Sequence, residues 1–213
     1  MENVKSTVVA ISRQLGSGGS FIGRRVAGRF GFKYLDREIL QQAAKYLGEE
    51  EARLSYREER VSGFWENFLR TFSFSNPESG YVTPAPALVY DKDLIEVERR
   101  IIREVADQHN AVIIGRGAPL ILADHPGAVK VFVHAPREFR LKRVMEAYGI
   151  SNASEALSMI EDTDRRRERY IRTTFGVHMR DARSYHLCID TGAVGLEAAE
   201  EMVILLIRSL RHL

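Results

Sequence analysis

Cysteine, lysine and long apolar runs are scarce in this chain of 213 residues. Its single cysteine, Cys188, cannot form a disulfide within the chain, which excludes a small scaffold held together by disulfides. The longest unbroken apolar run covers residues 202–207 and is far too short to span a bilayer. The opening segment, MENVKSTVVAISR, carries an acidic residue early and reaches Arg13 after a short apolar run, unlike a signal peptide. We therefore expect a cytoplasmic protein that does not enter a membrane.

Lysine supplies only six of the 31 basic side chains, and arginine supplies the other 25. The 29 acidic residues bring the formal net charge to +2, and the basic residues are dispersed among them. Nucleic-acid binding is therefore a weak alternative, and we expect none. A hydrophobic content of 45% and a charged content of 28% are typical of a folded globular chain. The bias toward arginine is more informative, because a guanidinium binds phosphate and carboxylate groups in a fixed, two-pronged geometry.

Short apolar strands alternate with helices along the chain. The strands are predicted at residues 6–11, 32–35, 111–114, 128–134 and 187–190. Helical patterns lead from the glycine-rich turn to Gly31 and then cover residues 37–47, 91–108, 136–148 and 195–213. This order predicts an α/β fold in which helices cover both faces of a five-stranded parallel sheet.

Two regions interrupt the alternation. Residues 49–95 begin with a charge-rich helical pattern and continue through GFWENFLRTFSF, and residues 151–176 centre on EDTDRRRERYIR. A connection as long as the first, inside a compact domain, is typical of a functional insertion. We predict one domain over residues 1–213 that carries both insertions. A group of aromatic side chains in the first one fits a subdomain core, a homodimer contact or a stacking surface for a nucleobase: Phe64, Trp65, Phe68, Phe72 and Phe74.

The segment VVAISRQLGSGGSFIGRRVA joins the first strand to the first helix through a glycine-rich turn. Free N–H groups at a helix N-terminus bind anions, so this arrangement favours phosphate binding over a merely tight connection. Against the P-loop pattern G-x-x-x-x-G-K-[ST], residues 13–20 keep Gly18 and Ser20. Gly19 stands where the lysine is expected, and Arg13 stands where the first glycine is expected.

From here the chain resembles the cytidylate-kinase-like family, a branch of the nucleoside monophosphate kinases. Four segments carry the resemblance in the family's order: ISRQLGSGGSFIGRRVA, FKYLDREIL, AVIIGRGAPLILADHPGAVKVFVHAPREFRLKRV, and DTDRRRERYIR with YHLCIDTG. The resemblance implies a three-layer P-loop NTPase sandwich, in which residues 49–95 form a helical insertion on the acceptor side and residues 151–176 an arginine-rich lid. It also implies transfer of the γ-phosphoryl group of ATP, with Mg²⁺, to a nucleoside monophosphate, with CMP or dCMP as first choice.

The resemblance places the donor nucleotide at the glycine-rich loop. The residues expected to bind ATP are Gly16, Ser17, Gly18, Gly19, Ser20, Arg140, Arg143, Arg165 and Arg166. Ser20 and Asp36 are the residues expected on the Mg²⁺ side. Each has a structural alternative, because a hydroxyl or a carboxylate at these positions also caps a helix. A solvated basic face is the alternative for Arg140 and Arg143, which lie three residues apart.

Five residues are expected to act on the transferred group or the acceptor: Arg13, Asp36, Arg116, Asp164 and Arg167. Arg13 is the nearest cation that could replace the missing lysine, although it could also only cap the strand. Arg116 directly follows a buried strand, and the resemblance gives it the α-phosphate of the acceptor. Asp164 and Arg167 share a helix face and match the family's Asp-x-x-Arg pair, with a solvated charged face as the alternative.

Two residues depart from true cytidylate kinases. Gln42 replaces an arginine that binds the acceptor phosphate, and Gly117 replaces an aspartate beside the nucleoside. Together with the missing lysine, these departures leave two rivals open: a non-catalytic nucleotide sensor, and a kinase for another small phosphate acceptor. His134, His178 and His186 lack metal-ligand spacing. Cys188, in an apolar strand, is expected to be a buried small hydrophobe.

Overall fold

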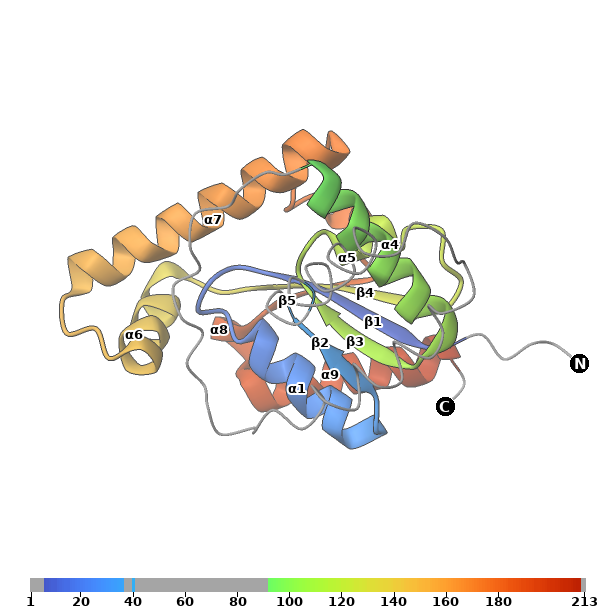
Figure 1. Ribbon diagram of the computed structural model, residues 1–213. Coiled ribbons are helices and arrows are strands. Elements are labelled where there is room, and N and C mark those ends of the chain that lie inside the picture. Colours follow the sequence, from blue (N-terminus) through green and yellow to red (C-terminus); the bar gives the residue numbers. More distant parts are fainter. Residues whose placement is uncertain (1–5, 37–39, 41–91, 212–213) are drawn as a thin grey trace, which may run out of the picture.

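The structure is a computed structural model that describes residues 6–36, 40 and 92–211 (Figure 1). Within these ranges, five strands form one parallel sheet in the order β2-β3-β1-β4-β5. They are β1 (Val8–Arg13), β2 (Lys33–Leu35), β3 (Ala111–Ile114), β4 (Ala128–His134) and β5 (Leu187–Asp190). The predicted five-stranded parallel sheet is confirmed. Because β1 pairs with both β3 and β4, the loops that follow these three strands meet at one edge of the sheet.

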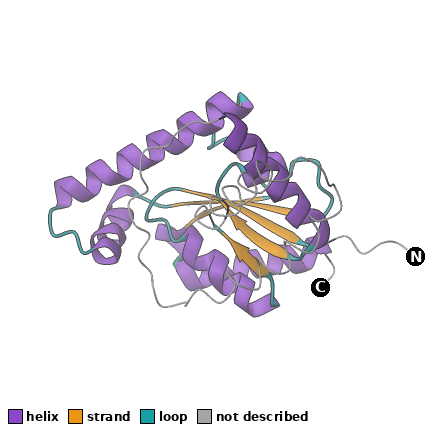
Figure 2. Cartoon of the chain, in the orientation of Figure 1, coloured by secondary structure: helices purple, strands orange, loops and turns teal. Residues whose placement is uncertain are grey.

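Helices cover both faces of the sheet (Figure 2), as predicted. The helices in the described ranges are α1 (Gly19–Phe30), α4 (Lys92–Gln108), α5 (Ala118–Ile121), α6 (Arg137–Tyr148), α7 (Ala153–Phe175), α8 (Thr191–Val194) and α9 (Leu196–Arg211), with a 3-10 turn at Ala182–Ser184. Helices α1 and α9 pack on one face, while α4 and α5 pack on the other. Within the same part of the chain, no helix has both the length and the apolar composition to cross a bilayer.

The first four residues of the central strand β1 are all apolar, and their positions in the fold show why. Val8 and Ala10 belong to the cluster that includes α4 and α5, whereas Val9 and Ile11 belong to the cluster that includes α1 and α9. All four side chains are completely buried. Successive strand residues point to opposite faces, so a strand covered on both sides needs apolar residues at every position.

Helix α7 occupies most of the region predicted as the lid. It begins after Asn152, whose side chain accepts a hydrogen bond from the N–H of Ser154 at 2.9 Å, and it ends at Gly176 with φ of 72°. Its first half packs on α6, where Val144 contacts Ala156 and Ile160. Its second half reaches the α4 side of the sheet (Figure 1). The lid function of this helix stays a prediction.

Some sequence predictions need adjustment. Strand β1 begins at Val8 and extends to Arg13. Its pairing with β4 continues as far as Arg13, which lies opposite Val133. Helices α5 and α8 were not expected, since four residues are too few to show a helical period. Apart from Leu40, the helix predicted over residues 37–47 lies outside the described residues. So does nearly all of the insertion at 49–95, and the last residues of that range belong to α4.

The expectation that Cys188 is buried was wrong, because its side chain is exposed. Strand β5 lies at the edge of the sheet and pairs with β4 alone. Ile189, the residue after Cys188, points into the core beside α9. Successive side chains of a strand point to opposite faces, so Cys188 points to the other face of the sheet. There it borders a small hollow instead of a helix.

Candidate active site at the phosphate loop

The loop between β1 and α1 is shaped for close approach of an anion to the main chain. Gly16 and Gly18 have φ of 79° and 85°, in the left-handed region that favours glycine. A Cβ atom on Gly16 would lie 2.8 Å from the carbonyl oxygen of Arg140, and one on Gly18 would collide with Leu196. No side chain in the described part of the chain caps the first turn of α1. The leading N–H groups of this helix are therefore suited to bind a phosphate.

Ser17, at the centre of the loop, is fully buried. Its hydroxyl donates to the carbonyl oxygens of Gln14 at 2.9 Å and Val133 at 3.0 Å. Its own carbonyl accepts a hydrogen bond of 2.7 Å from the hydroxyl of Thr191. The Ser17 side chain thus holds the loop against β4 and α8. Ser20, by contrast, is half-buried in the first turn of α1.

Arg13 and Gly19 fit together at the start of α1. A Cβ atom on Gly19 would lie only 2.7 Å from the Cβ of Arg13. At its other end the Arg13 side chain reaches the residue after β3, because a Cβ on Gly115 would collide with its Nη1 atom. Arg13 therefore occupies the space beside position 19 and carries its charge from the loop toward the end of β3.

The surroundings of Arg13 are charged but provide no direct partner for its Nε atom. This atom is buried and forms no hydrogen bond within the described ranges. Burial lowers the pKa of Arg13, Tyr34 and Asp36 act against that shift, and Arg116 adds to it. Two neighbouring guanidinium groups repel each other, and an anion between them would relieve the repulsion.

Asp36 directly follows β2 and lies beside α1. Its carboxylate is 3.8 Å from Nη2 of Arg24, and its carbonyl oxygen accepts a hydrogen bond of 3.0 Å from the N–H of Leu40. A residue whose carbonyl accepts the first bond of a turn sits at a helix-cap position, so the capping alternative for Asp36 has structural support. Its role toward Mg²⁺ or the acceptor stays a prediction.

Arg116 lies in a strained turn after β3. Its φ of 52° falls in the left-handed region, between Gly115 at 83° and Gly117 at 70°. Such a conformation is costly for a residue other than glycine and points to a functional or packing constraint. The guanidinium is almost buried and pairs with Glu98 of α4 at 3.0 Å, with exposed fractions of 8% and 1% for the two side chains. Sequence reasoning expects Arg116 to face a phosphate but misses this partner.

Gly117 packs directly against α7. A Cβ atom at this position would lie 2.5 Å from Cε2 of Phe175. The departure from the aspartate of true cytidylate kinases therefore has a physical reason, because the ring of Phe175 takes the space of a side chain. The positive φ of Gly117 adds to that constraint.

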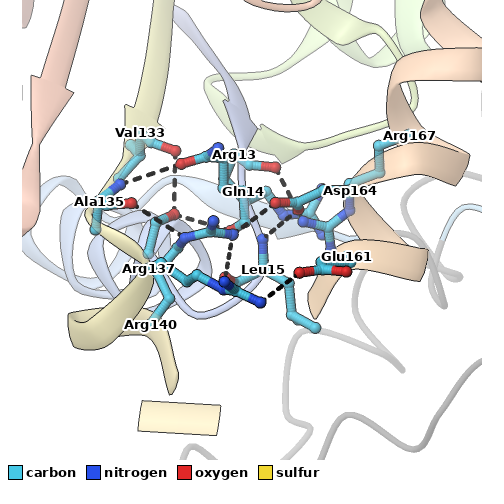
Figure 3. A network of polar contacts seen from close by, with 11 residues as sticks. Arg13, Gln14, Leu15, Val133, Ala135, Arg137, Arg140, Glu161, Asp164 and Arg167 are labelled. Carbon is cyan, nitrogen blue, oxygen red and sulfur yellow. Dashed lines mark hydrogen bonds and ion pairs between the residues drawn. The ribbon is translucent and has the colours of Figure 1, made fainter. Parts of the chain in front are cut away.

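Helix α7 contacts the phosphate loop through two of the predicted residues (Figure 3). The carboxylate of Asp164 accepts a hydrogen bond of 2.9 Å from the N–H of Leu15 and pairs at 2.5 Å with Nη1 of Arg140. One turn later, Nη1 of Arg167 donates to the carbonyl oxygen of Arg13 at 2.9 Å. The structure thus brings together Arg13, Arg140, Asp164 and Arg167, which lie far apart in the sequence.

The other arginines predicted to bind ATP have different surroundings. Arg165 and Arg166 are exposed on α7, and Arg165 pairs with Asp162 of the same helix. Arg143 is half-buried on α6, with Cζ 5.9 Å from the centre of the Phe139 ring. Their roles stay predictions.

An open hollow of about 950 Å³ lies along α7 and the segment before β5. Its lining residues are Arg140, Ile160, Glu161, Asp164, Arg165, Glu168, Arg169, Arg172, His178, Arg180 and Asp181. A second hollow, of about 430 Å³, lies at the ends of β1, β4 and β5 and also includes Arg180. The larger hollow thus borders three of the predicted residues and is rich in arginine.

Two residues of this region were missed in the sequence. Glu98 interrupts an apolar face of α4, because Ile95, Ile101 and Ile102 stand three and four residues away. A lone carboxylate in such a face signals a buried partner. Gln14 is buried as well, and its side-chain oxygen accepts a hydrogen bond of 3.2 Å from the N–H of Ala135. Nothing in the local sequence distinguishes Gln14 from an exposed loop residue.

The described residues contain no cluster of three or more His, Cys, Asp or Glu side chains that could enclose a metal ion. Mg²⁺ keeps water ligands and is commonly bound through one or two protein oxygens together with substrate phosphates. The oxygens of Ser20 and Asp36 are of the type that Mg²⁺ prefers.

Known proteins resemble this chain in sequence. A sequence model of the cytidylate kinase-like family matches residues 8–193. A cytidylate kinase from Thermococcus sibiricus is 27% identical over 188 residues, which cover 88% of this chain and 80% of that protein. One from Methanopyrus kandleri is 28% identical over 194 residues, which cover 87% and 85%.

Solved structures share the fold. An uncharacterized protein from Eubacterium ventriosum superposes with a TM-score of 0.71 and 24% identity, covering 96% of this chain and 99% of that one. A gluconokinase from Sinorhizobium meliloti gives a TM-score of 0.53 at 15% identity, with coverage of 98% and 95%. These neighbours and the sheet order establish the α/β fold of the P-loop NTPases. With the family match spanning most of its length, the chain belongs to the cytidylate kinase-like family.

Proposed function

We propose that this protein transfers the γ-phosphoryl group of ATP to a nucleoside monophosphate, with CMP or dCMP as the first choice of acceptor. Family membership supports a phosphotransferase of the kinase type, and the relatives named cytidylate kinase support the choice of acceptor. The products are ADP and the nucleoside diphosphate.

The observation that carries the proposal is the packing of Arg13 beside the glycine-rich loop. A P-loop lysine would have to start at position 19, where a Cβ atom already meets the Cβ of Arg13. Arg13 starts on the opposite side of that contact and extends toward Gly115. The stem of Arg13 thus lies beside the uncapped end of α1, and its guanidinium lies at the end of β3, beside Gly115. A guanidinium there can neutralise charge on the transferring phosphate.

Mg²⁺-ATP fits these residues. The main-chain N–H groups of Gly16, Gly18 and Gly19 would hold the β-phosphate at the start of α1. The hydroxyl of Ser20 and the carboxylate of Asp36 would hold the metal ion or its water ligands. When bound, the metal neutralises charge on the phosphate oxygens.

The chemical step needs positioning and charge stabilisation more than covalent chemistry by the protein. A phosphate oxygen of the acceptor forms a bond to the γ-phosphorus while the bond from that phosphorus to the β,γ-bridging oxygen breaks. The electron pair of the broken bond remains on ADP. In this proposal Arg13 stabilises the transferring group, while Arg116 and Arg167 stand on the acceptor side. Arg116 keeps its ion pair with Glu98 through Nη2, and the same guanidinium has further N–H donors for a phosphate.

Two rivals are separated by experiment. The replacement of an acceptor-binding arginine by Gln42 and of an aspartate by Gly117 leaves open a different small phosphate acceptor and a nucleotide sensor without turnover. A coupled assay of ADP release with CMP, dCMP, UMP and AMP tests all three. Turnover that is fastest with CMP or dCMP supports the proposal. ATP binding without turnover of any acceptor would identify a sensor.

The role of Arg13 is tested in the same assay. Arg13→Ala should lower kcat/KM for ATP by about a hundredfold or more, as expected for loss of a donor to developing charge. Arg208→Ala is the matched control, because Arg208 is exposed near the end of α9. If Arg13→Ala and the control had the same kcat/KM for ATP, another arginine would have to neutralise the phosphate charge in place of the missing lysine.

A further inference from the structure

We infer that Asp164 is a positioning residue that, together with Arg140, holds the phosphate loop in shape, and that it acts on ATP binding instead of on the acceptor. This inference rests on the proposed function for the identity of the ligand. It differs from the acceptor contact that the family resemblance implies for Asp164. The contacts of the carboxylate carry it (Figure 3).

Both carboxylate oxygens of Asp164 are used inside the protein. Oδ1 accepts the hydrogen bond from the N–H of Leu15, and Oδ2 pairs with Nη1 of Arg140. The side chains of Asp164 and Arg140 are each only 10% exposed. Each oxygen of this carboxylate already has one partner inside the protein, and its low exposure limits the access of a substrate to the remaining lone pairs.

Arg140 extends the same contact to the residue after β4 and makes a second contact with the loop. Its Nε donates to the carbonyl oxygen of Ala135 at 3.0 Å, and Nη1 also lies 3.4 Å from the carbonyl oxygen of Leu15. The main chain of Arg140 packs against the loop as well, because a Cβ atom on Gly16 would lie only 2.8 Å from the Arg140 carbonyl oxygen. Helix α6 therefore packs against the loop through Arg140, and Asp164 of α7 binds both Arg140 and the loop.

The contacts fall on the main chain of the loop. Asp164 binds the N–H of Leu15, and Arg167 binds the carbonyl oxygen of Arg13. The two residues stand one turn apart on α7, so a single face of this helix determines the path of the chain before Gly16. Removing Asp164 would free the N–H of Leu15 and leave the Arg140 charge buried without its partner.

The consequence differs from that of an acceptor contact. A loop that loses its shape binds the phosphates of ATP poorly, whereas loss of an acceptor ligand raises the KM of the acceptor alone. Asp164→Ala should therefore raise the Kd of Mg²⁺-ATP about tenfold or more, while the acceptor KM at saturating ATP stays within about twofold.

Glu161→Ala is the matched control. Glu161 lies one turn earlier on the same helix and pairs with Arg137 of α6 at 2.6 Å, but both side chains are exposed. This variant removes an ion pair between the same two helices without touching the loop. It should leave the Kd of Mg²⁺-ATP unchanged.

ATP titration without an acceptor and amide hydrogen exchange test the inference independently of turnover. In the unliganded protein, Asp164→Ala should increase the exchange rate at Leu15, while Glu161→Ala should not. If the Ala variant does not fold, Asp164→Asn is used, which keeps one acceptor for Leu15 and loses the charge opposite Arg140. An unchanged Kd for Mg²⁺-ATP combined with a raised acceptor KM would overturn the inference, as would unchanged exchange at Leu15. Absence of turnover with every acceptor would count against the proposed function only.

Discussion

Arg13 and Gly19 are packed so closely that position 19 has no room for a side chain. The Cβ of Arg13 lies 2.7 Å from the place where a Cβ of residue 19 would be. The usual P-loop pattern has glycine at the first of these positions and lysine at the second, and this chain has the larger residue first. Arg13 therefore requires glycine at position 19, and a lysine at position 19 would require a smaller residue at position 13.

This coupling predicts non-additive mutations. Gly19→Lys alone should lower Tm and weaken ATP binding, because the new Cβ collides with Arg13. The double variant Arg13→Gly/Gly19→Lys restores the usual pattern and should recover both quantities in large part. Thermal unfolding and ATP titration measure the two effects.

Gly28→Ala is the control for a glycine of the same helix. A Cβ atom there meets nothing within 4 Å, and Gly28 is exposed in the last turn of α1. This substitution should stabilise the protein by about 0.5–1 kcal/mol, because alanine has the higher helix propensity. A double variant no better than Gly19→Lys would show that the two positions are independent.

The buried pair of Glu98 and Arg116 predicts a large loss of stability when one partner is removed. Glu98→Leu should lower the free energy of unfolding by about 3–5 kcal/mol, because the guanidinium stays buried without its counter-charge. Replacing both residues, as in Glu98→Leu/Arg116→Met, should recover much of that loss. Urea unfolding gives the comparison.

The neighbouring pair of Glu96 and Arg99 serves as a reference on the same helix. It has a short distance of 2.6 Å, but the Glu96 side chain is 67% exposed. Glu96→Gln should therefore change the free energy of unfolding by about 0–1 kcal/mol. Equal changes in the free energy of unfolding for Glu96→Gln and Glu98→Leu would contradict the buried position of the Glu98–Arg116 pair.

Introducing the aspartate of true cytidylate kinases at position 117 should harm this protein. Gly117→Asp places a side chain against the ring of Phe175 and requires a positive φ from a residue other than glycine. We expect a lower Tm, and a partial recovery in the double variant with Phe175→Ala. A Tm equal to that of the wild type would show that α7 can move away from this turn.

Cys188 should react with a thiol reagent in the native protein, because its side chain is exposed. Neighbouring atoms nevertheless bury the sulfur in part, and this partial burial raises the pKa of the thiol. Less of the reactive thiolate is therefore present near neutral pH. The rate should lie below that of a free model thiol at pH 7 and continue to rise at pH values where the model thiol has levelled off. Cys188→Ser removes the only cysteine and should abolish the reaction. A reaction that requires denaturant would contradict the exposed position.

The amino-acid sequence by itself determined the order of the five strands, most of the longer helices and the location of the phosphate loop. Residues 111–114, 128–134 and 187–190 are strands with the predicted limits, because each is a short apolar run bounded by turn residues. The loop was recognisable for a similar reason. Its glycines mark a turn in the sequence, since Gly16 and Gly18 adopt the positive φ that favours glycine.

Only the tertiary structure decided which charged side chains meet. Asp164 binds a loop 149 positions earlier in the chain, and Glu98 meets Arg116 across the turn after β3. It also decided that Cys188 faces outward, since this depends on which strand lies at the edge of the sheet. Local periodicity shows which face of an element is apolar, but it carries no information on which distant residue is packed against a given charge. The charges of this site acquire their partners only when the loop, α6 and α7 come together at the end of the sheet.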